Sequence, residues 1–187
     1  MINSGLSALM QVMNMITKFR TDLINEKGFL YAIDFETRLN LDILSALNFD
    51  KLNIKNAAPA FAELVNSFET DATLALVAGN DRTDWKKLIE LVNKNWKGTA
   101  VLEPEEKDSP KEAIKDALDA FSFVARKIEA LKRIARVAEK NAIFLKEINV
   151  KTRLKNLNKA LLDVNKCLSL VIRDIDSGGK KIGKNRK

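Results

Sequence analysis

The stretch LKNLNKALLDVNKCLSLVIRDI, residues 154–175, carries apolar residues in unbroken steps of three and four. Seven positions share this stripe: Leu154, Leu157, Leu161, Val164, Leu168, Val171 and Ile175. Steps of this size return to one face of an α-helix, so the stretch predicts a long helix with a single apolar seam. Cys167 lies beside the seam, where we expect a packed thiol and not a nucleophile.

A second stripe precedes this helix and runs in a different register. Its positions are Ile114, Leu118, Phe121, Val124, Ile128, Leu131, Ala135, Ala138, Ala142 and Leu145. Carried past Leu145, the same register would put Lys155 and Lys159 in the core, so we expect a turn at 148–150 with Asn149 as a helix cap. Ser109, Pro110 and Glu112 have the spacing of a capping box and predict the start of this fifth helix. Residues 110–177 therefore predict a long antiparallel helical hairpin.

The N-terminal part predicts four more helices and no strand. Their expected ranges are 4–27, 32–47, 57–76 and 83–97. Glycines follow the periodic stretches, where left-handed helix ends are expected: Gly28, Gly79, Gly98 and the pair Gly178–Gly179. The predicted fold is thus an all-α bundle of about six helices. It comprises an N-terminal part at 1–97, an acidic linker at 98–109, the hairpin at 110–177 and a disordered basic tail at 178–187, expected to form one compact domain.

Charge is divided unevenly along the 187 residues. The net charge is +7, but residues 1–109 hold 12 basic and 16 acidic side chains, whereas residues 110–187 hold 20 and 9. Such an asymmetry indicates either a polyanionic partner or docking of one half on the other. A solvated, lysine-rich helix surface is the plainer explanation.

Basic residues recur every seven positions on the two long helices, opposite the apolar seams. One column holds Arg126, Arg133 and Lys140, and the other holds Lys159, Lys166 and Arg173, with Lys180 and Lys181 following in the tail. Charges about 10 Å apart along a helix can follow a phosphate backbone without reading sequence. The same positions are where any helical pair places its solvated lysines, so both interpretations stay open.

Two other features suggest a surface for a protein partner. Residues 1–17 carry no charge and contain all four methionines, including Met10 and Met13, which indicates either burial in the bundle or contact with another subunit. Trp85 and Trp96 are three helical turns apart and share a face, as interface anchors or as core residues.

The composition gives little support for a catalytic function. With no histidine and one cysteine, the chain has no histidine base, no Cys–His pair, no disulfide and no His- or Cys-based zinc site. No phosphate loop, dinucleotide loop or EF-hand spacing occurs. Acid pairs that could seed a carboxylate-bound Mg²⁺ are Asp81 with Asp84, Glu105 with Asp108, and Asp116 with Asp119, each of which also suits a helix start or a linker.

We therefore expect a non-enzymatic helical interaction or scaffold protein without a cofactor, which self-associates or binds another protein. The alternatives are a sequence-independent RNA- or DNA-binding protein that uses residues 110–187, and a carboxylate–magnesium enzyme. Residues 1–17 are too polar and too short to span a bilayer, so we expect no membrane partner and a cytoplasmic location.

Overall fold

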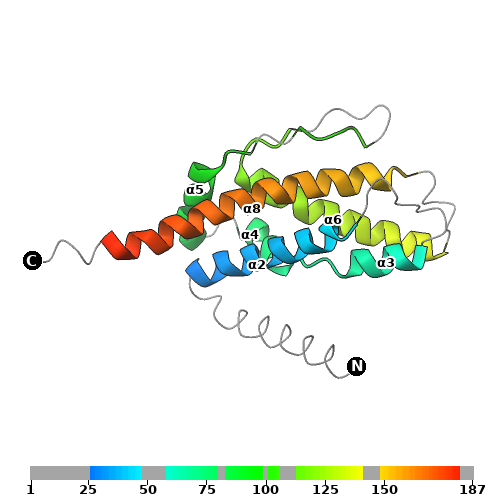
Figure 1. Ribbon diagram of the computed structural model, residues 1–187, viewed down its shortest axis with the longest axis horizontal. Coiled ribbons are helices and arrows are strands. Elements are labelled where there is room, and N and C mark those ends of the chain that lie inside the picture. The colour runs from blue at the N-terminus through cyan, green and yellow to red at the C-terminus, as the bar shows by residue number, and fades with distance from the viewer. Residues whose placement is uncertain are drawn as a thin grey trace, which may run out of the picture.

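The computed structural model is all-helical, as predicted (Figure 1). It describes residues 26–47, 58–79, 83–98, 101–105, 113–140 and 148–181. The helices in these ranges are α2 (Glu26–Ser45), α3 (Ala58–Asn66), α4 (Asp71–Ala78), α5 (Thr83–Asn95), α6 (Ala117–Lys140) and α8 (Val150–Lys181), and no strand accompanies them. The predicted first helix lies outside the described residues except at its last two positions.

The two long helices form the centre of the bundle. In Figure 1, α6 and α8 lie side by side and run in opposite directions. Helix α2 packs against α8, α3 and α4 pack against α6, and α5 contacts both long helices. The N-terminal helices therefore cover the predicted hairpin and do not stand apart from it. Residues 141–147, which would close the hairpin, are outside the described residues.

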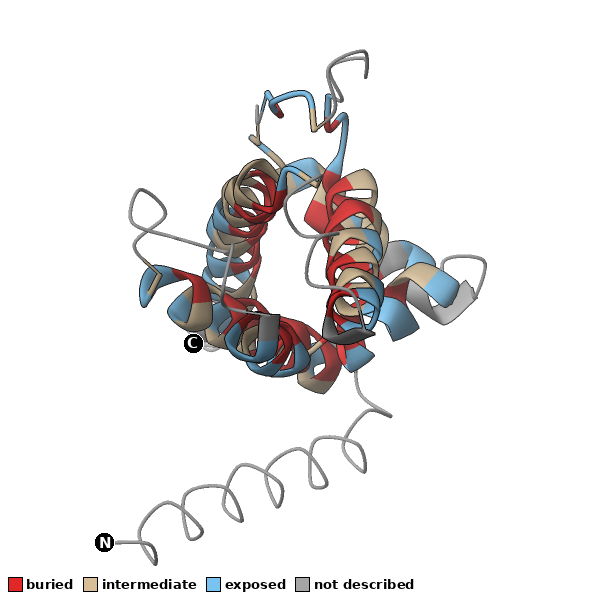
Figure 2. Ribbon diagram, turned by 90° about the vertical axis from the view of Figure 1, so that its right-hand side faces the viewer, coloured by how far each residue is buried: buried red, intermediate tan, exposed pale blue. Residues whose placement is uncertain are grey.

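The buried faces of the helices turn toward a shared interior (Figure 2). The predicted seam of α8 lies there, since its positions from Leu154 to Val171 are each at most 1% exposed. The α6 stripe from Phe121 to Ala138 faces it and is equally buried. Each fully buried leucine contributes about 1.5–3 kcal/mol relative to an exposed one, so these two stripes supply much of the driving force for folding.

Helix α8 begins where the change of register predicted a turn. The Thr152 amide donates a hydrogen bond to the Asn149 Oδ1 at 3.2 Å, and the Arg153 amide donates to the Asn149 carbonyl at 3.1 Å. This confirms Asn149 as the helix cap, because its side chain satisfies an amide that has no partner within the helix.

Helix α6 begins at Ala117, seven residues later than the Ser109–Pro110 pattern predicts. The Asp119 amide donates to the Asp116 side chain at 2.8 Å, while the Asp119 side chain accepts from the Lys115 amide at 3.1 Å. The Ala117 amide donates to Asn93 of α5 at 3.0 Å. Residues 113–116 are not helical, so the prediction that this helix begins at Pro110 is wrong, whereas Ser109, Pro110 and Glu112 themselves lie outside the described residues.

The single helix predicted for 57–76 is also wrong, because α3 and α4 are separated by residues 67–70. Two polar side chains of α2 occupy this break. Asn40 Nδ2 donates to the Glu69 carbonyl at 2.7 Å and its Oδ1 accepts from the Glu69 amide at 2.9 Å. Glu36 accepts hydrogen bonds from the amides of Ala72 and Thr73, at the start of α4. Side chains from another helix thus replace the hydrogen bonds that a continuous helix would make.

The glycines mark helix ends only in part. Gly79 follows α4 and its amide donates to the Ala75 carbonyl at 3.0 Å, but with a φ of −97° it is not left-handed. Gly28 lies inside α2, and Gly178–Gly179 lie inside α8, so the predicted ends there are wrong. At Gly98 a side chain would overlap the Trp96 ring, so glycine allows the close approach of that ring.

Candidate interaction surface

Residues 101–105 of the predicted acidic linker lie in a fixed place against α8, and we call them the strap. Leu102 is 1% exposed and belongs to the core. Asn156 of α8 accepts from the Glu103 amide at 2.9 Å and donates to the Glu103 carbonyl at 2.8 Å. Both hydrogen-bonding groups of one strap residue are therefore paired with one buried side chain, much as in a β-ladder. Residues 101–105 of the expected linker therefore have a defined geometry.

The acids of the strap neutralise cations of both long helices. Glu105 Oε2 lies 2.7 Å from Arg153 Nη1 of α8, and Glu105 Oε1 lies 2.8 Å from Lys127 Nζ of α6. All three side chains are at most 18% exposed. Glu103 pairs with Lys159 at 3.0 Å in a more exposed position, and this contact lowers the pKa of the Glu103 carboxyl. The strap is thus an acidic cover over part of the basic half.

An open groove of about 800 Å³ lies beside this covered region, and we call it the arginine groove. Its apolar lining comes from three parts of the chain: Leu74 of α4, Ala130 and Ile134 of α6, and Ile148 before α8. Its charged lining consists of Arg126, Glu129, Arg133 and Arg153. Leu74 is 39% exposed, so part of this apolar lining is accessible from solvent. The groove thus combines three arginines and one acid with an accessible apolar surface.

The arginines of the groove differ in how far their charge is compensated. Arg126 and Arg133 are exposed and form no ion pair with any residue that the structure describes. Arg126 Nε donates to the Ser122 carbonyl of its own helix, at 3.3 Å. Arg153, by contrast, is paired with Glu105 of the strap. Two uncompensated guanidinium groups, about 10 Å apart along α6, therefore face solvent beside an apolar floor.

The residues of the two predicted basic columns lie in different surroundings. Arg126 and Arg133 come together with Arg153, a residue that the heptad pattern did not single out. On α8, Lys159 is paired with Glu103, Lys166 lies 3.5 Å from Asp163, and Arg173 is exposed. The side chains of Lys140, Lys180 and Lys181 are not described, although Lys180 and Lys181 continue α8 beyond its predicted end.

The predicted protein-contact residues are placed only in part. Met10 and Met13 lie outside the described residues, and the side chain of Trp85 is not described. Trp96 is half-buried and packs against the core. The position of Trp96 favours the core role that the spacing of the two tryptophans allowed. A surface shared by Trp85 and Trp96 stays a prediction.

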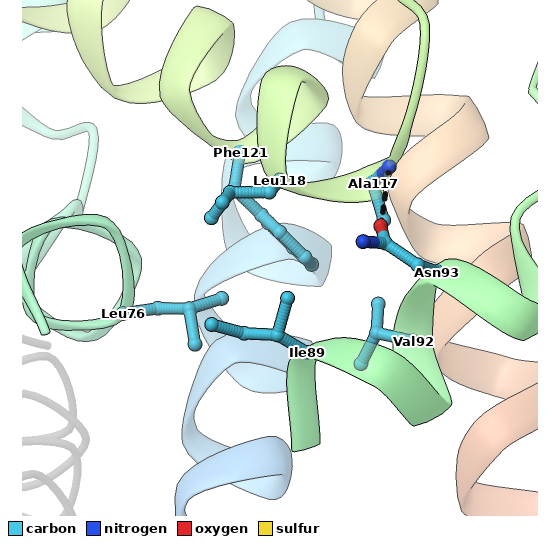
Figure 3. Close-up of a pocket in the computed structure, with 7 residues that line it drawn as sticks. All are labelled: Leu76, Ile89, Val92, Asn93, Ala117, Leu118 and Phe121. Carbon is cyan, nitrogen blue, oxygen red and sulfur yellow. Dashed lines mark hydrogen bonds between the residues drawn. The ribbon is translucent and has the colours of Figure 1, made fainter. Parts of the chain in front are cut away.

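One small space in the interior lies between α4, α5 and α6 and has no room for a substrate (Figure 3). This space is only about 10 Å³, at the lower limit for one water molecule. Its walls are apolar side chains such as Leu76, Ile89 and Phe121, and Asn93 is engaged with the Ala117 amide. A cavity of this size is a packing gap and not a binding site.

Nucleophile and metal chemistry find no support in the described part of the chain. Cys167 is 2% exposed, its Sγ donates to the Val92 carbonyl at 3.3 Å, and burial raises the pKa of its thiol to about 11. No three acidic or cysteine side chains converge among the described residues as a metal ion would require. Nor is any described helix long and apolar enough to cross a membrane.

Comparisons with protein-family models, with curated proteins and with solved structures found no match to this chain. The functional proposal below therefore rests on the arginine groove and the strap.

Proposed function

We propose that this chain is a non-enzymatic interaction protein that binds an acidic, partly apolar segment of another protein in the arginine groove. The observation that carries the proposal is the exposure of Arg126 and Arg133, which make no ion pair with any described residue, beside the apolar floor of Leu74 and Ile134. Arginine is enriched at protein interfaces because its flat, weakly hydrated guanidinium group packs well and binds carboxylates in a fork.

The chemistry of the floor favours a protein segment over a nucleic-acid backbone. Phosphates would gain from Arg126 and Arg133 but nothing from Leu74, Ile134 and Ile148, whereas an amphipathic peptide uses both kinds of contact. The strap also neutralises Lys159, a member of the second basic column. RNA or DNA binding is therefore the outcome that would replace this proposal.

The test uses the full chain and a fluorescein-labelled peptide of about twelve residues in which leucines alternate with pairs of glutamates. A peptide with glutamine in place of glutamate controls for apolar binding alone. We expect saturable binding of the acidic peptide at low salt, weakened about tenfold or more in the double variant R126A/R133A. The matched control K166A/R173A removes the same charge from α8 and is expected to bind as the wild type does.

Three results would overturn the proposal. One is no saturable binding of the acidic peptide. Another is equal weakening by both double variants, which would indicate a non-specific charge effect. The third is tighter binding of a mixed-sequence oligonucleotide than of the peptide, with a steep dependence on salt, which would favour nucleic-acid binding.

Self-association remains part of the proposal, with a second copy as one source of the acidic segment. Its sequence basis is the uncharged stretch 1–17 with Met10 and Met13. Light scattering at micromolar concentrations should give a mass above that of one chain, and a strict monomer at all concentrations would remove this part.

A further inference from the structure

Arg153 belongs to two features at once. It lines the arginine groove, and its Nη1 lies 2.7 Å from Glu105 Oε2 in the strap. Glu105 is also 2.8 Å from Lys127, so one carboxylate compensates two cations at the side of the groove. The strap thereby sets how much positive charge the groove presents.

We propose that Glu105 is an internal competitor for the acidic partner, so that the strap lowers the affinity of the groove while it is docked. The inference rests on the function proposed above, because it concerns the same occupant. With the strap in place, the groove offers two uncompensated arginines, Arg126 and Arg133. When Glu105 withdraws, Arg153 loses this carboxylate, and its guanidinium can bind a carboxylate of the partner in the place of Glu105.

The strap itself shows the kind of segment that the face of α8 beside the groove accepts. Its Leu102 is buried at 1% exposure, and two glutamates at alternate positions reach Lys159 on one side and Arg153 on the other. An apolar residue followed by acids is the same chemistry that we propose for the partner. The chain therefore already binds, within itself, a segment of the class that the groove would take from another protein.

The anchors of the strap lie outside the groove, which makes the competition adjustable. Asn156 holds the Glu103 backbone, and Leu102 fills a core position, but neither residue lines the groove. A substitution at Asn156 that removes its hydrogen bonds to Glu103 should release Glu105 from Arg153 without changing any residue that lines the groove. Binding at the groove and docking of the strap are then coupled, and by linkage each must weaken the other by the same factor.

The first test compares E105Q with E90Q in the peptide assay. Glutamine keeps the shape of Glu105 and removes its charge, while Glu90 is an exposed acid of α5 that controls for the same change in net charge. We expect E105Q to bind the acidic peptide about fivefold or more tightly than the wild type at low salt, with E90Q unchanged. In N156A we expect a shift in the same direction.

The second test needs no variant and so does not depend on E105Q folding well. Hydrogen exchange of the Glu103 amide, which donates to Asn156, should accelerate when the acidic peptide saturates the wild-type chain. The glutamine peptide should leave the exchange unchanged.

The outcomes separate this inference from the proposed function. If R126A/R133A weakens peptide binding but E105Q does not tighten it, the proposed competition by Glu105 is overturned, whereas the proposal that the groove binds an acidic segment is supported. Equal tightening by E105Q and E90Q, or unchanged exchange at Glu103 on saturation, also overturns the competition. If neither the wild type nor E105Q binds the peptide, both proposals fail.

Discussion

Asn156 and Glu103 form a two-way backbone clamp: the asparagine accepts from the Glu103 amide at 2.9 Å and donates to its carbonyl at 2.8 Å. Asn40 makes the same pair of bonds with Glu69, at the break between α3 and α4. Each asparagine is 1% exposed. The fold thus uses one device twice, a buried amide on a long helix that holds a non-helical residue in place.

Replacing Asn156 should release the strap at a measurable cost. In N156A, the amide and carbonyl of Glu103 lose their partner, and we expect the free energy of unfolding to fall by about 1–3 kcal/mol. Denaturant unfolding measures this loss. N158A is the matched control, since Asn158 lies on the same helix and its side chain makes no hydrogen bond with the part of the chain that the structure describes. Equal losses in the two variants would contradict the role of the clamp.

The sequence predicted the parts of the fold that depend on local spacing. The structure confirms the predicted seam from Leu154 to Val171 and the predicted cap at Asn149. Sequence could predict both because periodicity and capping act within a few residues. Arg126 and Arg133 were singled out by the same spacing. The seven-residue spacing predicts which face of a helix a residue occupies. The placement of these arginines on the exposed face of α6 therefore follows from the sequence.

The rest depends on contacts between distant residues, which no local pattern contains. Asn40 meets a residue 29 positions away, Asn156 one 53 away, and Arg153 pairs with Glu105 across 48 positions. The break between α3 and α4 follows from such contacts. The predicted start of α6 was wrong for another reason, because Asp116, and not Ser109, caps the helix that packs in the bundle.

Glu36 should make the stability of the protein depend on pH. Burial raises the pKa of its carboxyl above 4.5, although the hydrogen bonds from Ala72 and Thr73 act in the opposite direction. A raised pKa contributes stability that is present below pH 4.5 and is lost as the pH rises through the folded-state pKa. We therefore expect the free energy of unfolding of the wild type, relative to E36Q, to decline between pH 4 and pH 7.

Urea unfolding of both proteins over this range measures the difference. At pH 4, E36Q should be less stable than the wild type by about 1 kcal/mol, because an amide cannot accept all the hydrogen bonds that the carboxyl accepts at the start of α4, and this difference should shrink as the pH rises. A difference that grows with rising pH would contradict the raised pKa.

Cys167 should react only when the protein opens. Its thiol is buried, and the pKa of about 11 leaves little thiolate at neutral pH. We expect a thiol reagent at pH 8 to label the native chain at a rate that tracks unfolding and rises with added denaturant. The variant C167A/S169C moves the thiol to an exposed position of α8 and should react at once. Rapid labelling of native wild type would contradict this burial.

Removing the groove arginines should separate stability from binding. Arg126 and Arg133 form no ion pair among the described residues, so R126A and R133A should change the free energy of unfolding by no more than about 0.5 kcal/mol. R153A should cost about 1–3 kcal/mol, because Glu105 is only 12% exposed and would lose one of its two cations. Thermal or denaturant unfolding of the three variants gives the comparison. A loss in R126A or R133A as large as that in R153A would mean that the fold itself requires them, whereas the expected result leaves their charge available to a partner.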